Sequence, residues 1–181
     1  IIAFGLFAML SACHTKTSTT DNPLLTESTL DFYAPPFDKI LPEHFMPAIK
    51  QGIAEQQAEI DSIIRNPETP TFANTILAYE KSGRLLTRAS TLLSVLTSAN
   101  GTDELRKVEA TPLLSAHHDA LLLNEKLFAR VKAVYDADTL LTGEDQRLTE
   151  VLYREFVHAG ALLSAGSRDS LSKINGELSV L

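Results

Sequence analysis

Histidine side chains are the first candidates for chemistry, because the sequence holds five of them and a single cysteine. A zinc-protease helix needs two histidines four residues apart with a glutamate between them, and the sequence contains no such arrangement. His117 and His118 are adjacent, so on a helix their side chains would point about 100° apart. We therefore expect them to lie on a helix surface or as a hydrogen-bonded pair, and not to share one metal ion.

Glu155 and His158 form a Glu-x-x-His motif at helical spacing, as used by di-iron helical bundles. Such bundles need a second copy of the motif and two further glutamates, but only one copy is present. A Gly-x-Ser-x-Gly nucleophile motif is missing, and "SAGS" at 164–167 lacks the lysine and spacing of a phosphate-binding loop. The residues by themselves therefore assign no catalytic, cofactor-binding or metal-binding position.

Cys13 follows a short apolar run over residues 1–10. This run is too short for a membrane-spanning helix, which needs about 20 residues, and its length is typical of a signal-peptide core. Leu10-Ser11-Ala12-Cys13 resembles a bacterial lipobox, which predicts a lipoprotein signal peptide over 1–13 with lipid attached to Cys13. Residues 14–22 are polar and rich in threonine, as expected of a flexible tether. The alternative is an inert, buried cysteine in an N-terminal helix.

The expected location is accordingly the bacterial cell envelope, with the chain attached to a membrane by lipid and facing the periplasm. No Lys or Arg precedes Cys13 and position 1 is not Met, so we expect the basic start of the leader to lie upstream. The 181 residues are 44% apolar and 22% charged, a normal balance for a globular protein, and the net charge is -7. A negative net charge argues against nucleic acid as a partner.

Apolar residues recur at helical spacing through most of the body, which predicts an all-α fold. A proline-rich strap over 23–42 should be held by Phe32, Phe37 and Ile40. The first predicted helix covers 45–64. A long helix follows, which is capped by Thr71, has Gly83 on its inner face and ends at Asn100-Gly101. The next helical segment starts with Asp103 as its cap and reaches about residue 123, and another helix is capped by Asn124. Two more helices follow. The first starts at a Thr142/Asp145 capping box and is expected to bury Leu148, Leu152, Phe156 and Leu163. The second is capped by Ser167 and runs to Leu181 without a stop signal. We therefore expect the protein to continue.

The stretch "NPETPTFANTILAYEKSGRLLTR" over 66–88 resembles the front part of the thimet-type zinc oligopeptidases, above all their bacterial dipeptidyl carboxypeptidase branch. The matching positions are Pro70, Thr71, Phe72, Asn74, Thr75, Ile76, Glu80, Ser82 and Gly83. Three further blocks resemble the family in the same order, namely "APPFDKILPEHFMPAIKQGI", "AHHDALLLNEKLFARVKAVYD" and "LYREFVHAGALLS" with "LSKINGELSVL". The resemblance covers about 22–181. One departure is Ala73, where relatives often carry Glu.

This resemblance implies that residues 23–181 form the multi-helix N-terminal portion of a larger, clam-like metallopeptidase. Its zinc lies on a later His-Glu-x-x-His helix with a further glutamate, and no residue of this chain matches those ligands. The whole protein would hydrolyse oligopeptides and release C-terminal dipeptides with zinc as cofactor, whereas this chain alone would be inactive. Its partners would be oligopeptide substrate, the membrane and the remainder of its own chain. Asn74 and Asp119 are expected to form a helix cap or an interhelical hydrogen bond. The alternative function is a non-enzymatic helical envelope lipoprotein that serves as a binding module.

Overall fold

The computed structural model describes residues 22–137 and 141–179, and within these it contains helices and turns without strands. The all-α prediction is therefore confirmed. Cys13, the expected signal peptide and nearly all of the expected tether lie outside the described residues. In chain order the elements are η2 (Asp31–Tyr33), α1 (Pro42–Arg65), η3 (Phe72–Ile76), α2 (Leu77–Glu80), α3 (Arg84–Asn100), α4 (Asp103–Arg106), α5 (Thr111–Leu122), α6 (Glu125–Asp136), α7 (Gly143–His158) and α8 (Ala165–Leu178).

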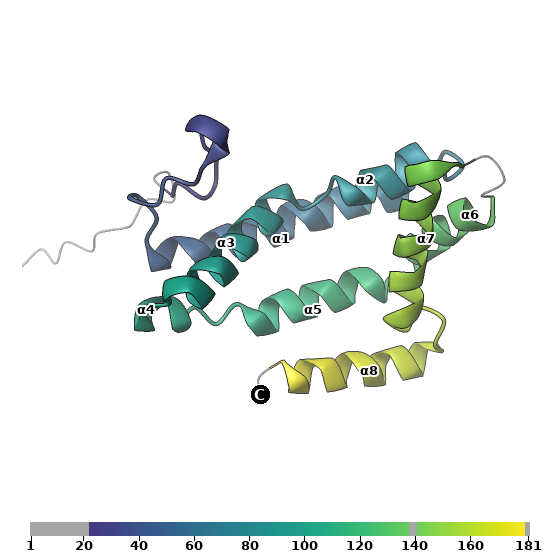
Figure 1. Cartoon of the computed structure of the whole chain (residues 1–181). Coiled ribbons are helices and arrows are strands. Elements are labelled where there is room, and N and C mark those ends of the chain that lie inside the picture. The colour runs from purple at the N-terminus through teal and green to yellow at the C-terminus, as the bar shows by residue number, and fades with distance from the viewer. Residues whose placement is uncertain (1–21, 138–140, 180–181) are drawn as a thin grey trace, which may run out of the picture.

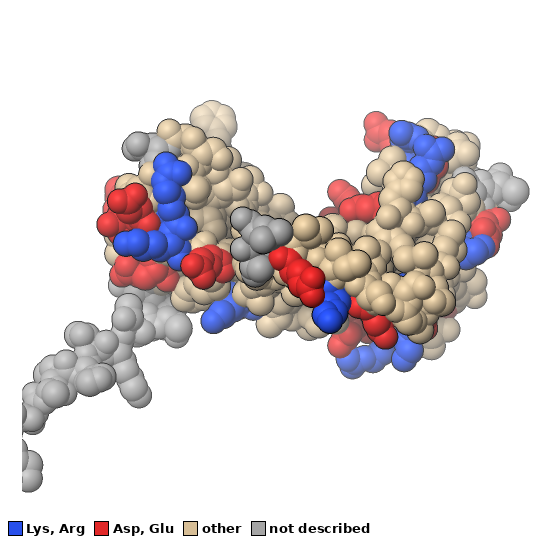
Figure 2. Space-filling view, turned by 90° about the horizontal axis from the view of Figure 1, so that it is seen from below, with Lys and Arg blue, Asp and Glu red and all other residues tan. Residues whose placement is uncertain are grey.

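Helix α1 runs along most of the molecule (Figure 1). Helix α3 packs along α1, and α5 and α8 lie beside each other below them (Figure 1). Helix α7 runs steeply across the direction of α1 at the end of the molecule opposite α4, where it packs on α6 and η3. Viewed from below, the molecule is hollowed between two lobes, with acidic and basic side chains interspersed on both (Figure 2). None of the helices in the described part of the chain combines the length and apolar character needed to cross a bilayer.

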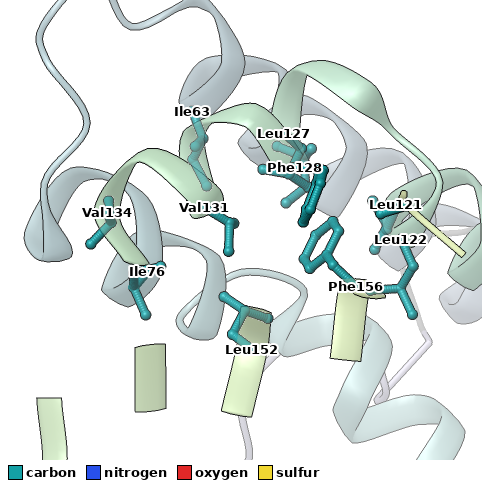
Figure 3. Packing of buried hydrophobic residues seen from close by; sticks show 12 residues of the cluster. Ile63, Ile76, Leu121, Leu122, Leu127, Phe128, Val131, Val134, Leu152 and Phe156 are labelled. Carbon is teal, nitrogen blue, oxygen red and sulfur yellow. The ribbon is translucent and has the colours of Figure 1, made fainter. Parts of the chain in front are cut away.

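Two clusters of buried side chains hold the fold together, one in each lobe. The first is centred on Phe156, Phe128 and Val131, which draw α5, α6 and α7 against α1 and η3 (Figure 3). The Phe128 and Phe156 rings lie nearly parallel, with centroids 5.9 Å apart. The second cluster joins α1 to α3 through Phe45, Ile49 and several residues of α3. Burying such large side chains contributes about 1.5–3 kcal/mol each, so helix pairing here follows directly from the apolar periodicity.

The long helix expected behind Thr71 is interrupted, which corrects the prediction. Thr71 is the N-cap as expected, because its Oγ1 accepts a hydrogen bond from the Asn74 N–H. The chain then forms the π-helical turn η3 and the short α2, and a break follows at Gly83, whose φ is 68°. A residue in this left-handed conformation cannot continue a right-handed helix. The Gly83 N–H instead donates to Glu59 Oε2 at 2.8 Å, which ties the break to α1.

Several helix starts differ from the prediction by a few residues. Thr102, not Asp103, caps α4 by accepting from the Leu105 N–H, and the segment expected to continue to 123 divides into α4 and α5. Ser164, not Ser167, caps α8 by accepting from the Ser167 N–H. Asn124 caps α6 as expected, because its Oδ1 accepts from two backbone N–H groups.

Three expectations about the last two helices are also wrong in detail. Thr142 makes no side-chain cap hydrogen bond, so the expected capping box with Asp145 does not form. Leu152 and Phe156 are buried as expected and Leu148 is partly buried, but Leu163 lies beyond the end of α7 and is exposed. Helix α8 ends at Leu178, and Leu181 lies outside the described residues.

Of the three residues predicted to hold the strap, Ile40 does so and Phe32 and Phe37 do not. Phe32 is 100% exposed and Phe37 is 57% exposed, whereas Ile40 packs partly against the second cluster. The buried side chain of the strap is Leu24. Its backbone carbonyl accepts from Arg88 Nη2 at 2.9 Å, so the start of the strap is fixed to α3.

Candidate functional site

A groove of about 560 Å³ lies in the corner between α5 and α7. Its lining residues are His118, Leu122, Val151, Arg154, Glu155, His158 and Ala159. The α5 residues are four apart and the α7 residues recur every three or four positions, so each set lies on one helix face. Helix periodicity thus places two imidazoles, a carboxylate and a guanidinium around an apolar floor.

The charges around this groove are partly compensated by their neighbours. Arg154 Nη2 pairs with Glu150 Oε1 at 2.6 Å along α7. Burial raises the pKa of Tyr79 to about 12, with smaller contributions from the negative charges of Glu155 and Glu80. Tyr79 therefore keeps its phenolic proton at neutral pH, and its ring packs on Phe156 at a centroid distance of 5.9 Å.

The Glu155/His158 motif is joined at the groove by His118, which the sequence did not connect with it. Within residues 22–137 and 141–179, however, no three His, Cys, Asp or Glu side chains are placed to hold one metal ion. The described residues therefore fit neither a di-iron centre nor a zinc site. The groove offers apolar contact with polar groups at its rim, which suits an extended peptide or another helix more than a metal.

His117 is not among the residues that line this groove and forms part of a partly buried hydrogen-bond chain. Its Nε2 lies 2.8 Å from Gln56 Oε1 on α1. Gln56 Nε2 donates to Ser82 Oγ at 3.2 Å, and the Ser82 hydroxyl donates to the Tyr79 carbonyl at 2.7 Å. Because the Ser82 proton is used, Gln56 must donate to Ser82 and accept from His117, which places the His117 proton on Nε2.

This chain of bonds joins α5 to α1 and α2. Burial lowers the pKa of the His117 imidazole, and the neighbouring His118 adds to this effect. His117 is therefore a neutral structural histidine that bonds to Gln56 and not to His118, whereas His118 lies on the helix surface as expected. His44 has a similar local role, because its Nδ1 accepts from the Leu41 N–H at the start of α1.

Asn74 makes both of the contacts expected from the sequence, a helix-cap hydrogen bond and a bond to another helix. Its Oδ1 accepts from the Thr71 N–H at 2.8 Å and from Arg130 Nη2 at 3.3 Å, and its Nδ2 donates to the Thr69 carbonyl at 3.0 Å. Arg130 of α6 also donates from Nη1 to the Asn66 carbonyl at 2.9 Å. The sequence reasoning missed Arg130, although a lone arginine between Phe128 and Val131 of an apolar helix face was a possible signal.

Asp119 also has the predicted structural role. Its carboxylate accepts from Asn175 Nδ2 at 3.0 Å, which links α5 to α8. Arg168 at the start of α8 pairs with Glu125 at the start of α6. These polar contacts hold α8 in place, although none of its residues is fully buried.

Asn74 and Asp119, which lie in the matched blocks, thus make structural contacts. Comparison with known proteins identifies relatives of the chain. The dipeptidyl carboxypeptidase of Escherichia coli (strain K12) is 42% identical over 168 residues, which are 90% of this chain and 24% of that protein. The chain is homologous to this peptidase. The resemblance stated from the sequence is therefore confirmed.

Two further relatives give the same result. The dipeptidyl carboxypeptidase of Salmonella typhimurium is 38% identical over 88% of the chain, and oligopeptidase A of Escherichia coli is 28% identical over 88%. The chain spans about a quarter of the length of these relatives. No family model matches the sequence.

Proposed function

We propose that this chain forms the N-terminal helical wall of an oligopeptide-hydrolysing peptidase that releases C-terminal dipeptides. The observation that carries the proposal is the 42% identity to a dipeptidyl carboxypeptidase over 90% of the chain. Identity at this level over nearly the whole chain favours the same fold and the same role within the larger enzyme. In this proposal zinc is the cofactor and its ligands lie outside this chain, because the described residues offer no matching ligand set.

The surface of the molecule supports a role as one part of a larger structure. Leu171, Ile174 and Leu178 recur at helical spacing on α8, and the last two are among the exposed large apolar residues. The corner groove between α5 and α7 reaches Ala159, the first residue of the turn that leads from α7 into α8. An apolar helix stripe next to a groove is typical of a surface that contacts protein or peptide.

Peptidase activity is tested with the product of the complete coding region. We expect it to release the C-terminal dipeptide from an N-blocked tetrapeptide, to leave the same peptide with a C-terminal amide intact, and to lose activity with a metal chelator. The 181-residue chain alone serves as the control and is expected to be inactive. Peptide binding without cleavage by the complete product would refute the proposal and favour a non-enzymatic binding module.

We further propose that Cys13 carries a lipid that attaches the protein to the bacterial envelope on its periplasmic side. The Leu10-Ser11-Ala12-Cys13 motif behind an apolar run supports this. Lipid chains contribute about 0.8 kcal/mol per buried methylene, so two or more chains give stable attachment. Labelling of growing cells with radioactive palmitate should mark the wild type and not Cys13→Ser, and equal labelling of both proteins would contradict the proposal.

A further inference from the structure

The strap presents an apolar surface that neither core cluster uses. Its large side chains are between 47% and 100% exposed, and we call them the strap face: Leu30, Phe32, Tyr33, Phe37 and Leu41. Single exposed apolar side chains are normal on a protein surface, but a cluster of them marks an interaction site. In Figure 1 this segment projects from one end of α1 and α3.

The backbone of the strap holds these side chains outward in a defined conformation. Phe32 and Tyr33 have φ values of 58° and 57°, a left-handed conformation that costs non-glycine residues about 1–3 kcal/mol each. The turn is closed by the Tyr33 N–H donating to the Leu30 carbonyl at 2.9 Å and by Ser28 Oγ donating to the Ala34 carbonyl at 2.6 Å. An unfavourable conformation that turns two aromatic rings towards solvent indicates a surface shaped for a partner.

Contacts on both sides of this turn fasten the strap to the helices. Asn22 Nδ2 donates to the His44 carbonyl at 2.8 Å, and Arg84 Nη2 pairs with Glu27 Oε1 at 2.7 Å. Ile40 packs partly against the second core cluster. The strap face is therefore presented at a fixed place on the body.

The charges beside the strap face indicate the chemistry of the partner. Between residues 28 and 44 the sequence carries Asp31, Asp38 and Glu43 against Lys39. This acidic border repels an anionic bilayer surface, and it repels the same face of a second copy. It suits an apolar pocket bordered by Lys or Arg side chains. The homologous dipeptidyl carboxypeptidase has about three quarters of its length beyond the part that this chain matches.

We propose that the strap face docks into an apolar, basic-rimmed pocket in the remaining part of the peptidase and thereby fixes this helical wall to it. The inference rests on the proposed function, because that function supplies the remaining part. In the structure Phe32 is fully exposed, so truncation of its side chain affects stability only if a partner covers it.

The test uses the product of the complete coding region with Cys13→Ser, so that no lipid is attached, at low micromolar concentration without membranes. Hydroxyl-radical footprinting should show Phe32, Tyr33 and Phe37 oxidised at least about tenfold more slowly than in the same protein unfolded in urea. Phe32→Ala should lower the urea midpoint, whereas Val95→Ala, an exposed apolar position on α3, should change it less.

Oxidation of the strap face at the unfolded rate, with an unchanged midpoint for Phe32→Ala, would overturn the inference. Protection that requires added lipid vesicles, or that rises with protein concentration, would overturn it in favour of a bilayer or a second copy. Dipeptide release is measured on the same samples. Protection of the strap face without dipeptide release would keep the docking inference and refute the peptidase proposal. Dipeptide release without protection would keep the peptidase proposal and refute the docking inference.

Discussion

Replacement of Gly52 by alanine gives a sharp test of how α1 and α3 pack. Gly52 lies in the middle of α1, where the backbone of α3 approaches closely. A Cβ atom added at Gly52 would lie 2.6 Å from the Leu86 backbone nitrogen and 2.7 Å from its Cα. Carbon atoms in favourable contact are about 3.5–4.0 Å apart, so the two helices would have to separate by about 1 Å.

Two opposing terms set the expected size of the effect. Alanine is more favourable than glycine in a helix interior by about 1 kcal/mol. Overpacking costs about 1–3 kcal/mol, and the upper half of this range applies because the contacted atoms belong to the backbone and cannot rotate away. We therefore expect Gly52→Ala to lower the free energy of unfolding by about 1–2 kcal/mol.

Gly176→Ala is the matched control. Gly176 lies in α8, and no atom lies within 4 Å of the position its Cβ would occupy. Only the propensity term applies there, so this variant should be more stable than the wild type by up to about 1 kcal/mol. Urea denaturation followed by circular dichroism measures both variants. If Gly52→Ala were as stable as Gly176→Ala, the close approach of α1 and α3 would be refuted.

Three further outcomes follow from the buried contacts. Phe156→Ala should destabilise the protein by about 3–5 kcal/mol, because it opens a cavity in the first cluster. Val151→Ala, on the exposed side of the same helix, should change stability by less than about 0.5 kcal/mol. Equal urea midpoints for the two variants would contradict this. Asn124→Ala should cost about 1 kcal/mol because two N–H groups at the start of α6 lose their acceptor, and unfolding that matches the wild type would show that the cap is not needed. The pKa of His117 is lower in the folded than in the unfolded protein, so the unfolded state binds more protons and stability is lost as pH falls below the ordinary histidine value of about 6.5. His117→Gln should remove this part of the pH dependence of the urea midpoint, and an identical profile for the variant would argue against it.

The local chemistry of the sequence was sufficient at two helix starts, although it named the wrong cap at three others. Thr71 and Asn124 cap their helices as predicted because a short polar side chain can reach backbone N–H groups two or three residues on. The buried face of α6 also follows a local pattern, since Leu127, Val131 and Val134 recur at helical spacing and are all buried. The resemblance to the oligopeptidases was visible in the sequence because it rests on several blocks of residues in the same order and not on any single contact.

Two of the errors, at Gly83 and in the strap, arose where two local choices have similar energies and a distant contact decides between them. Gly83 fits the apolar periodicity of a single long helix, but its N–H is taken up by Glu59 from α1, and this favours a break. The three aromatic and aliphatic strap residues looked equivalent in sequence, yet only Ile40 reaches a core cluster. The spacing of apolar residues in an irregular segment does not show which of them face the helices of the protein.

The candidate site divides in the same way. Composition, helix periodicity, the caps at Thr71 and Asn124 and the family relationship were determined by the sequence, because each depends on residues close together in the chain. Only the tertiary structure brought His118 to the Glu155/His158 face, turned His117 towards Gln56, and placed Arg130 over the Asn74 turn. These pairings join residues more than thirty positions apart, and their geometry is set by how α5, α6 and α7 pack on α1 and η3, which no local pattern encodes.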